Sequence, residues 1–213
     1  MTPSRDVPIQ PASSALLLID VQNFCCHRNG GEYSGLSDTE FDKSYANFMR
    51  KIWEETIPNM QLLQKEFRVA GIEVLYTTIE SLTKDGRDRS LDYKITGFNV
   101  PKGSWDGQVI DELKPGEDEI RFCKSSSSVF ISTHIDYVLR NLGIKQLVMA
   151  GLVTDQCVES AIRDACDLGY LVTQVTDACA TYTSERQRHS LNAIKGYCRQ
   201  IATSEILKEI NSV

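Results

Sequence analysis

The sequence predicts a three-layer α/β fold with a mostly parallel, Rossmann-like sheet of six strands. Short apolar runs of strand length alternate along the chain with longer segments whose apolar residues recur at helical spacing. Such alternation is typical of parallel strands with helices on both faces of the sheet. No internal repeat, low-complexity tail or linker interrupts the pattern, so we expect residues 1–213 to form one domain.

The N-terminal half of the chain holds the first two predicted strands. Residues 15–20, ALLLID, form a nearly all-apolar run, which is expected for a strand buried on both faces. Residues 41–71 have a helical period that ends at Gly71, and Pro58 within them either kinks this helix or begins a second one. The next strand is predicted at residues 72–78, and the long irregular stretch after it has the length of a functional loop.

The C-terminal half continues the alternation with four more strands. Two of its helices begin with a Ser or Thr followed three residues later by a side chain that can complete a capping box, Thr133 with Asp136 and Ser184 with Gln187. The predicted strands are residues 119–124, 145–151, 170–178 and 199–203, and the predicted helices are residues 132–143, 155–168, 184–198 and 204–210.

Composition and charge exclude several classes of protein. Apolar residues make up 41% and charged residues 24% of the chain, as in soluble globular proteins. The net charge of −6, with no run of Lys or Arg, argues against a nucleic-acid surface. No apolar window reaches the ~18 residues of a membrane span. The N-terminus lacks the pattern of a signal peptide, so a cytoplasmic location is the default expectation, with unconventional export left open.

The cysteines and histidines do not follow a disulfide or metal pattern. The seven cysteines are irregularly spaced and include no C-x-x-C pair, which favours free thiols in a reducing compartment. Cys25, Cys26 and His27 are consecutive, and three consecutive side chains do not converge readily on one ion. We therefore expect no metal and no cofactor.

Three reactive side chains follow three different predicted strands. Asp20 ends the first strand, Lys124 ends the third, and Cys157 lies in the first turn of the helix after the fourth. In a parallel α/β sheet, ligands bind beyond the carboxyl ends of the strands, where these residues would meet. A helix N-terminus and a nearby lysine both lower the pKa of a thiol, and Asp20 can take the thiol proton. Each residue alone also fits a packing, strand-ending or surface role, but their joint placement predicts a nucleophilic catalytic centre.

The motifs that carry these residues resemble those of the isochorismatase-like cysteine hydrolases. The matching segments are LLLIDVQNF, CKSSSSVF and GLVTDQCV, and the resemblance extends from about residue 15 to residue 202. It implies that Asp20, Lys124 and Cys157 are the catalytic triad, and that the protein is a homo-oligomer.

The resemblance also implies an oxyanion hole and the absence of a metal. A cis peptide between Leu152 and Val153 would turn the backbone amides of Val153 and Cys157 toward the oxyanion of a tetrahedral intermediate. Nicotinamidases of this family hold a metal with an Asp-x-His motif and a further His after the second strand, where this chain has Glu80 and no histidine. We therefore predict neither a metal nor nicotinamidase activity.

Several residues are candidates for substrate contact. Arg87, Arg89 and Lys94 lie in the long loop, where an arginine fork would suit a substrate carboxylate, although they also fit a solvated loop. Gln156 precedes the nucleophile, and Phe24 follows the first strand one residue earlier than in many relatives, which changes the aromatic wall of the pocket. We take Arg87, Gln156 and Phe24 as the substrate-binding candidates.

Other side chains near these motifs have weaker claims. Tyr33 and Trp105 fit a site wall, core packing or an oligomer contact equally well, and the serine run at residues 125–128 reads as a strand-to-helix connection.

Three functions follow from this reading. The first is hydrolysis of a C–N bond in a small amide or ureido compound through a covalent Cys157 intermediate, with Asp20 as general acid and base and Lys124 as its electrostatic partner. The second is cleavage of the vinyl ether of isochorismate to pyruvate and 2,3-dihydro-2,3-dihydroxybenzoate, including a role in a plant pathogen. The third is a non-catalytic binding protein. The cysteine favours the first.

Overall fold

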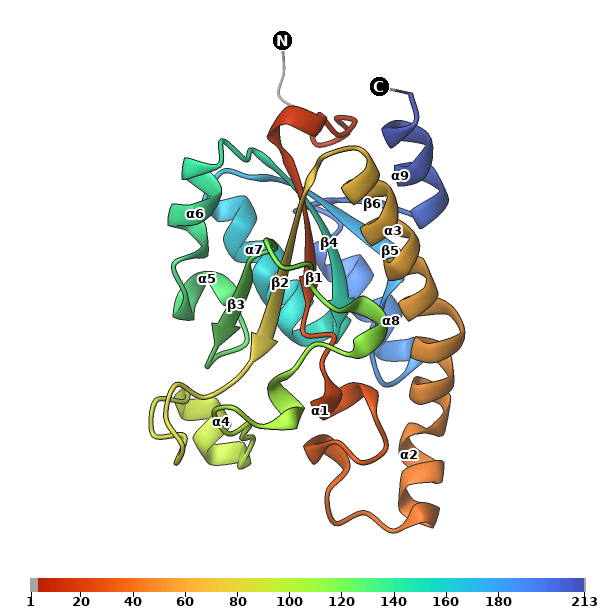
Figure 1. The fold of residues 1–213 in the computed structure, drawn as a ribbon. Helices are drawn as coiled ribbons and strands as arrows, with labels where there is room; N and C mark the ends of the chain where they lie inside the picture. The colour runs from red at the N-terminus through yellow and green to blue at the C-terminus, as the bar shows by residue number, and fades with distance from the viewer. Residues whose placement is uncertain (1–3, 213) are drawn as a thin grey trace.

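The computed structural model describes residues 4–212 and contains one six-stranded sheet between two layers of helices (Figure 1). All neighbouring strands are parallel, and their order is β3-β2-β1-β4-β5-β6. The predicted six-stranded α/β/α fold is therefore confirmed. The strands are β1 (Ser14–Ile19), β2 (Glu73–Ile79), β3 (Arg121–Lys124), β4 (Gln146–Leu152), β5 (Leu171–Ala180) and β6 (Arg199–Ile201).

Helices cover both faces of this sheet. They are α1 (Asn23–Cys26), α2 (Asp38–Lys51), α3 (Ile57–Val69), α4 (Leu91–Thr96), α5 (Val129–Ser132), α6 (Ile135–Asn141), α7 (Glu159–Asp167), α8 (Ser184–Ile194) and α9 (Thr203–Ile210). α3 and α9 pack together on one face, whereas α7 packs with α5 and α8 on the other. α1 and α4 lie at the end of the molecule opposite the two chain termini (Figure 1).

The central strands explain both the sequence pattern and the position of the site. Every residue of β1 and β4 is buried, as two-sided helical cover requires, whereas the edge strands β3 and β6 are partly exposed. β2 and β3 lie on one side of β1, and β4, β5 and β6 lie on the other side. The strand order therefore reverses between β1 and β4. Ligands in such sheets bind at the carboxyl ends of these two strands.

The predicted helix at residues 41–71 is longer and has three parts. Ser37 begins it with a capping box, in which its hydroxyl accepts a hydrogen bond from the Glu40 amide and the Glu40 carboxylate accepts one from the Ser37 amide. A π-helical segment, Ile52–Thr56, joins α2 to α3. Pro58 lies in the first turn of α3, directly after this π-helical segment, which is where the regular α-helical hydrogen-bond pattern is interrupted.

The two predicted capping boxes are wrong. Thr183, one residue before Ser184, caps α8 by accepting a hydrogen bond from a backbone amide of its first turn. Asp136 does not return to Thr133, because its carboxylate pairs with Arg140. The predicted helix at residues 132–143 is observed as the shorter α6, and the separate short helix α5 ends at Ser132.

Within residues 4–212, no helix combines the length and the apolar character needed to cross a membrane.

Candidate active site

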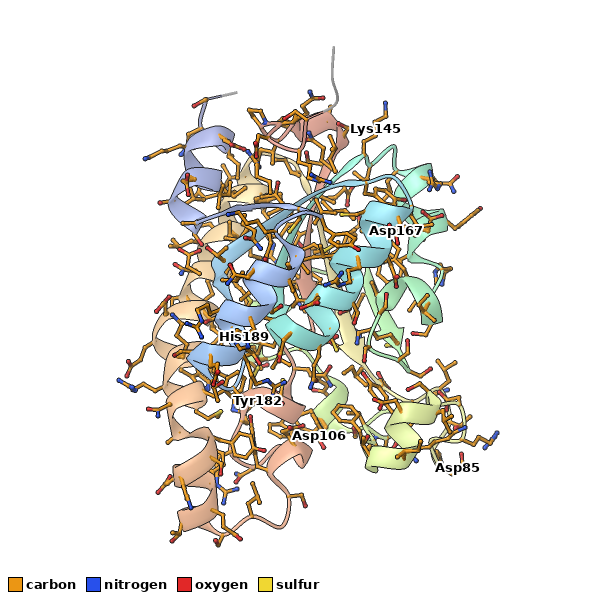
Figure 2. The ribbon with its side chains drawn as sticks, turned by 180° about the vertical axis from the view of Figure 1, so that it is seen from behind. Asp85, Asp106, Lys145, Asp167, Tyr182 and His189 are labelled. Atoms are coloured by element: carbon orange, nitrogen blue, oxygen red, sulfur yellow. The ribbon has the colours of Figure 1, made fainter. Side chains whose placement is uncertain are left out.

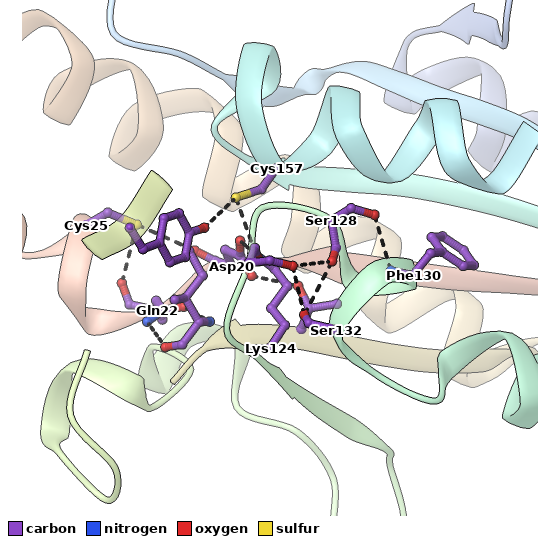
Figure 3. A network of polar contacts seen from close by, with 12 residues as sticks. Asp20, Gln22, Cys25, Lys124, Ser128, Phe130, Ser132 and Cys157 are labelled. Atoms are coloured by element: carbon purple, nitrogen blue, oxygen red, sulfur yellow. Dashed lines mark hydrogen bonds and ion pairs between the residues drawn. The ribbon is translucent and has the colours of Figure 1, made fainter. Parts of the chain in front are cut away.

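Asp20, Lys124 and Cys157 meet in a buried contact beyond the carboxyl ends of the strands (Figure 3). Lys124 Nζ lies 2.8 Å from Asp20 Oδ2 and 3.3 Å from Cys157 Sγ. The three residues are only 3%, 1% and 5% exposed, respectively. Charged side chains are rarely buried to this degree unless they are paired, so the ion pair accounts for the burial of both charges.

Each of these side chains comes from a different strand end. Asp20 follows β1 with φ of 54°, a left-handed conformation that Asp tolerates better than most residues, and its Oδ1 accepts a hydrogen bond from Thr77 Oγ1 at 2.7 Å. Lys124 is the last residue of β3, so its side chain spans the width of β2 to reach Asp20. Lys124 Nζ also donates to the Ser126 carbonyl at 3.0 Å. Cys157 belongs to a π-helical segment that follows β4.

Burial controls the protonation of the thiol. The pKa of Cys157 is raised to about 12, chiefly by burial and also by Asp20, while Lys124 acts in the opposite direction and lowers it. Burial opposes the charge of Lys124, but Asp20 and Cys157 hold the pKa of its ammonium group above the ordinary value. The resting centre is therefore a neutral thiol beside a lysine–carboxylate ion pair.

The backbone before Cys157 presents amide groups at the start of a helix. The Leu152–Val153 peptide is cis. The Gln156 and Val158 amides both donate to the Val153 carbonyl, at 3.1 and 3.4 Å, whereas no hydrogen bond joins that carbonyl to the Cys157 amide in the described backbone. The π-helical turn thus leaves the Cys157 amide without the bond to the Val153 carbonyl that a regular α-helical turn would give it.

A small cavity of about 40 Å³ lies beside Cys157. Phe24 and Gln156, both predicted to contact substrate, line it, and the Phe24 ring packs against Phe98 with centroids 4.7 Å apart. The volume suits a water molecule rather than a substrate of several heavy atoms, so side chains must move to admit one. A larger groove of about 820 Å³ lies between α2 and α8 and contains none of the triad; Tyr182 borders both spaces.

The structure does not bring the predicted loop cations to this cavity. Arg87 is exposed and pairs with Asp85 at 3.0 Å. Arg89 donates from Nη1 to the Phe98 carbonyl at 2.6 Å, and Lys94 is exposed on α4. None of these cations lines the cavity.

Tyr33, Trp105 and Glu80 also lie outside the cavity lining. Tyr33 is buried and donates its hydroxyl to the Cys25 carbonyl at 2.7 Å, while the Trp105 ring lies 5.3 Å from that of His27. Glu80 accepts a hydrogen bond from the Gly103 amide at 2.7 Å. Across residues 4–212, no three His, Cys, Asp or Glu side chains gather in an arrangement that would hold a metal ion.

Comparison with known proteins identifies the family. The profile of the Isochorismatase domain matches residues 14–206 of this chain. The chain belongs to the isochorismatase family. It is accordingly a hydrolase, as its sequence predicted, and its triad residues all lie within the matched range.

Relatives of this isochorismatase-family hydrolase include enzymes that cleave C–N bonds. It is 31% identical over 194 residues to the ureidoacrylate amidohydrolase RutB of Rhizobium rhizogenes, covering 83% of this chain and 74% of the relative. A cysteine hydrolase from Pseudomonas syringae pv. phaseolicola superposes with a TM-score of 0.83 at 26% identity, over 100% of this chain and 99% of that one. N-carbamoylsarcosine amidase from Thermoplasma acidophilum gives 0.68 at 26% identity, over 90% and 96%.

Several side chains of the isochorismatase-family site had not been singled out from the sequence. Tyr93 OH lies 4.0 Å from Cys157 Sγ, and Phe98, Glu32 and Tyr182 line the cavity. Tyr93 lies on α4, Glu32 and Phe98 come from turns and loops, and their approach to the strand ends depends on tertiary packing. Tyr182 follows β5 by two residues, so its place beyond a strand end was a signal that the sequence offered.

Proposed function

We propose that this hydrolase cleaves the C–N bond of a small amide or ureido compound through a covalent intermediate on Cys157. The observation that carries the proposal is the contact of Lys124 Nζ with both Asp20 and Cys157 in one buried centre. A thiol, a carboxylate and an ammonium group in contact supply a nucleophile, a proton carrier and a counter-charge.

In the first half of the reaction, Asp20 accepts the thiol proton as Sγ of Cys157 attacks the substrate carbonyl carbon. The carbonyl electron pair moves to the oxygen, and the backbone amides of Val153 and Cys157 stabilise this oxyanion. The intermediate then restores the C=O bond and breaks the C–N bond, while Asp20 gives its proton to the departing nitrogen. Lys124 stays charged and stabilises the thiolate as it forms.

In the second half, water attacks the thioester carbon and gives a proton to Asp20. The C–S bond breaks, the acid product leaves, and Asp20 returns the proton to sulfur, which restores the neutral resting thiol. Phe24 and Gln156 contact the substrate in both halves, since they line the cavity beside the sulfur.

The test is ammonia release from a panel of small amides and ureas by the wild type and by Cys157→Ala. We expect the variant to lose essentially all activity, and the wild type to show a mass increase on the peptide containing Cys157 when rapidly quenched. Cys166→Ser is the matched control, because Cys166 lies on α7 outside the cavity lining. Full activity of Cys157→Ala would contradict the covalent mechanism.

The other two functions give different results in the same experiments. Isochorismate cleavage would release pyruvate in a coupled assay and would not need the Cys157 sulfur. A non-catalytic binding protein would release neither product. The amidohydrolase names of the relatives favour the first function over both.

We propose further that the protein is a homo-oligomer in a reducing compartment such as the cytoplasm. Leu91 and Ile95, four residues apart on α4, are 73% and 76% exposed and form an apolar face that a second copy would cover. All seven cysteines are free, which fits a reducing compartment. Light scattering should give a multiple of the 23.9 kDa chain mass, and a monomer would contradict the proposal.

A further inference from the structure

A second carboxylate shares the cavity with the catalytic Asp20. Glu32 belongs to the 3₁₀ turn Gly31–Tyr33 after α1, and its side chain lines the cavity together with Asp20 and Cys157. Tyr182 OH donates a hydrogen bond to Glu32 Oε1 at 2.8 Å. No Lys, Arg or His among the described residues lies within ion-pair distance of Glu32.

The backbone holds this turn closely against the floor of the site. A Cβ atom on Gly30 would lie 2.2 Å from the Phe24 carbonyl oxygen, so only glycine allows this approach. The Gly31 amide donates to Asp106 Oδ1 at 3.3 Å. In Figure 2, Asp106 and Tyr182 lie toward the end of the molecule that carries α1. These contacts hold the turn in place, so the backbone position of Glu32 is well defined.

The acidic side chains Asp20 and Glu32 line the cavity, and its lining includes no Lys, Arg or His among the described residues. Lys124 is already paired with Asp20 and in contact with Cys157. Arg186 lies over the Tyr182 ring but is paired with Asp155. Arg87 and Arg89 face other partners outside the cavity. An anionic substrate would therefore meet Glu32 with no side-chain cation to offset the repulsion.

Burial makes the ionised form of Glu32 unfavourable unless a further hydrogen-bond donor or a cation binds it. Burial raises the pKa of its carboxyl, and the Tyr182 hydrogen bond only partly opposes this rise. A half-buried carboxylate without a cation is costly, and a ligand ammonium or N–H group supplies the missing donor.

We propose that Glu32, assisted by Tyr182 and Gln156, binds an ammonium or N–H-donating end of the substrate, so that the enzyme selects cationic or polar amides and ureas over those that carry a carboxylate. The inference rests on the proposed C–N hydrolysis and names its substrate class. This substrate class differs from the carboxylate that an arginine fork would bind. It also differs in charge from ureidoacrylate, the carboxylate for which several bacterial relatives are named.

A matched series of ureas tests the substrate class. (2-Aminoethyl)urea, propylurea and 3-ureidopropionate are similar in size but are cationic, neutral and anionic. We expect kcat/KM for ammonia release to be at least about tenfold higher for the cation than for the anion, and Glu32→Gln to reduce this ratio several-fold. Glu73→Gln, on the exposed opposite end of β2, is the control and should leave the ratio unchanged. An anion hydrolysed as well as the cation would overturn the proposal.

A second experiment does not depend on turnover. Labelling of Cys157 by cationic, neutral and anionic methanethiosulfonates is followed by mass spectrometry of its peptide, with rates divided by those of glutathione. We expect the cationic reagent to react fastest and Glu32→Gln to remove most of this preference, while Glu73→Gln keeps it. A preference unchanged in Glu32→Gln would overturn the subsite. Labelling that follows the expected pattern, with no urea or amide hydrolysed, would support the subsite and contradict the proposed reaction.

Discussion

Asp20 acts on Cys157 in two opposite ways. Its carboxylate is the proposed acceptor of the thiol proton, yet its negative charge adds to the burial that raises the pKa of Cys157. The carboxylate is therefore useful for turnover but unfavourable to a free thiolate at rest. Burial and the Asp20 charge thus both favour a protonated sulfur, against the opposing effect of Lys124.

Asp20→Asn should uncouple these two properties. Without the carboxylate, Lys124 has the sulfur as its nearby anionic partner, so the pKa of Cys157 falls and alkylation shifts to lower pH. We expect iodoacetamide to modify Cys157 several-fold faster at pH 8, since each pKa unit gives about a tenfold change in thiolate below the pKa. Hydrolysis should fall by about 10²-fold or more. The readouts are the mass of the Cys157 peptide and ammonia release.

The control for this variant is Asp118→Asn, because Asp118 is exposed before β3. Both rates should then match the wild type. Slower alkylation in Asp20→Asn would show that the carboxylate favours the thiolate, contrary to the electrostatics described above.

At the scale of elements, the site depends on how closely β1 and β4 approach. Gly151 pairs with Ile19 in this parallel ladder, has φ of 143°, and would place a Cβ atom 2.2 Å from the Ile19 carbonyl oxygen. Both elements that carry the triad's acid and nucleophile would have to separate to accept a side chain here. The glycine therefore links the packing of β1 and β4 to the geometry of the proposed catalytic centre.

Gly151→Ala should destabilise the protein by about 3 kcal/mol or more, because the clash is with backbone and the conformation disfavours L side chains. Urea unfolding followed by circular dichroism measures the change. Gly196→Ala is the control, since a Cβ there meets open space, and it should change the unfolding free energy by less than about 0.5 kcal/mol. Equal effects of the two substitutions would remove the proposed role of Gly151.

The other end of the sheet is closed by an ion pair between two elements. Arg199 of β6 donates to Glu209 of α9 through Nη1 at 2.6 Å and Nη2 at 2.9 Å, and the Ile9 amide donates to the same carboxylate at 3.1 Å. Burial opposes the charge, but these hydrogen bonds hold the pKa of Glu209 below its ordinary value of 4.5. The contacts join the N-terminal segment, an edge strand and the last helix.

Glu209→Gln should lower the unfolding free energy by about 1–3 kcal/mol at neutral pH. The lowered pKa stabilises the fold above the unfolded value near 4.5, and this contribution is lost as the pH falls through the lower folded value. Wild type and variant should therefore differ by a constant amount from pH 6 to 8 and converge below pH 4.5. Glu117→Gln, an exposed change, should track the wild type. A gap that widens in acid would contradict the linkage.

For the whole molecule, sequence patterns predicted the fold and the meeting of Asp20, Lys124 and Cys157, but not the cavity. Parallel strands align their carboxyl ends, so residues that follow strands, such as Asp20 and Cys157, can be placed at one edge before the strand order is known. Glu32 and Tyr182 are 150 residues apart, and although Tyr182 follows β5 by two residues, Glu32 lies in a 3₁₀ turn that no strand directly precedes. Their meeting depends on the packing of turns, for which local sequence has no period. The loop position of Arg87 was visible, but its partner Asp85 was not anticipated.

Amide hydrogen exchange should distinguish the rigid central strands β1 and β4 from residues 80–110, here called the cover. β1 and β4 are fully buried at the centre of the sheet, so their amides should exchange slowest, while the short edge strand β6 exchanges faster. Residues 80–110, which supply Tyr93 and Phe98, contain little regular structure and should exchange faster still.

The cavity volume of about 40 Å³ requires this cover to move when a substrate enters. Alkylation of Cys157 by iodoacetamide should therefore change exchange within residues 80–110 and leave β1 and β4 unchanged, because both strands are fully buried and paired on both sides in the sheet. Mass spectrometry of peptic fragments measures both regions. A response in β1 and β4 without one in residues 80–110 would contradict this prediction. It would show that a ligand reaches Cys157 by separation of the two strands while the cover stays in place.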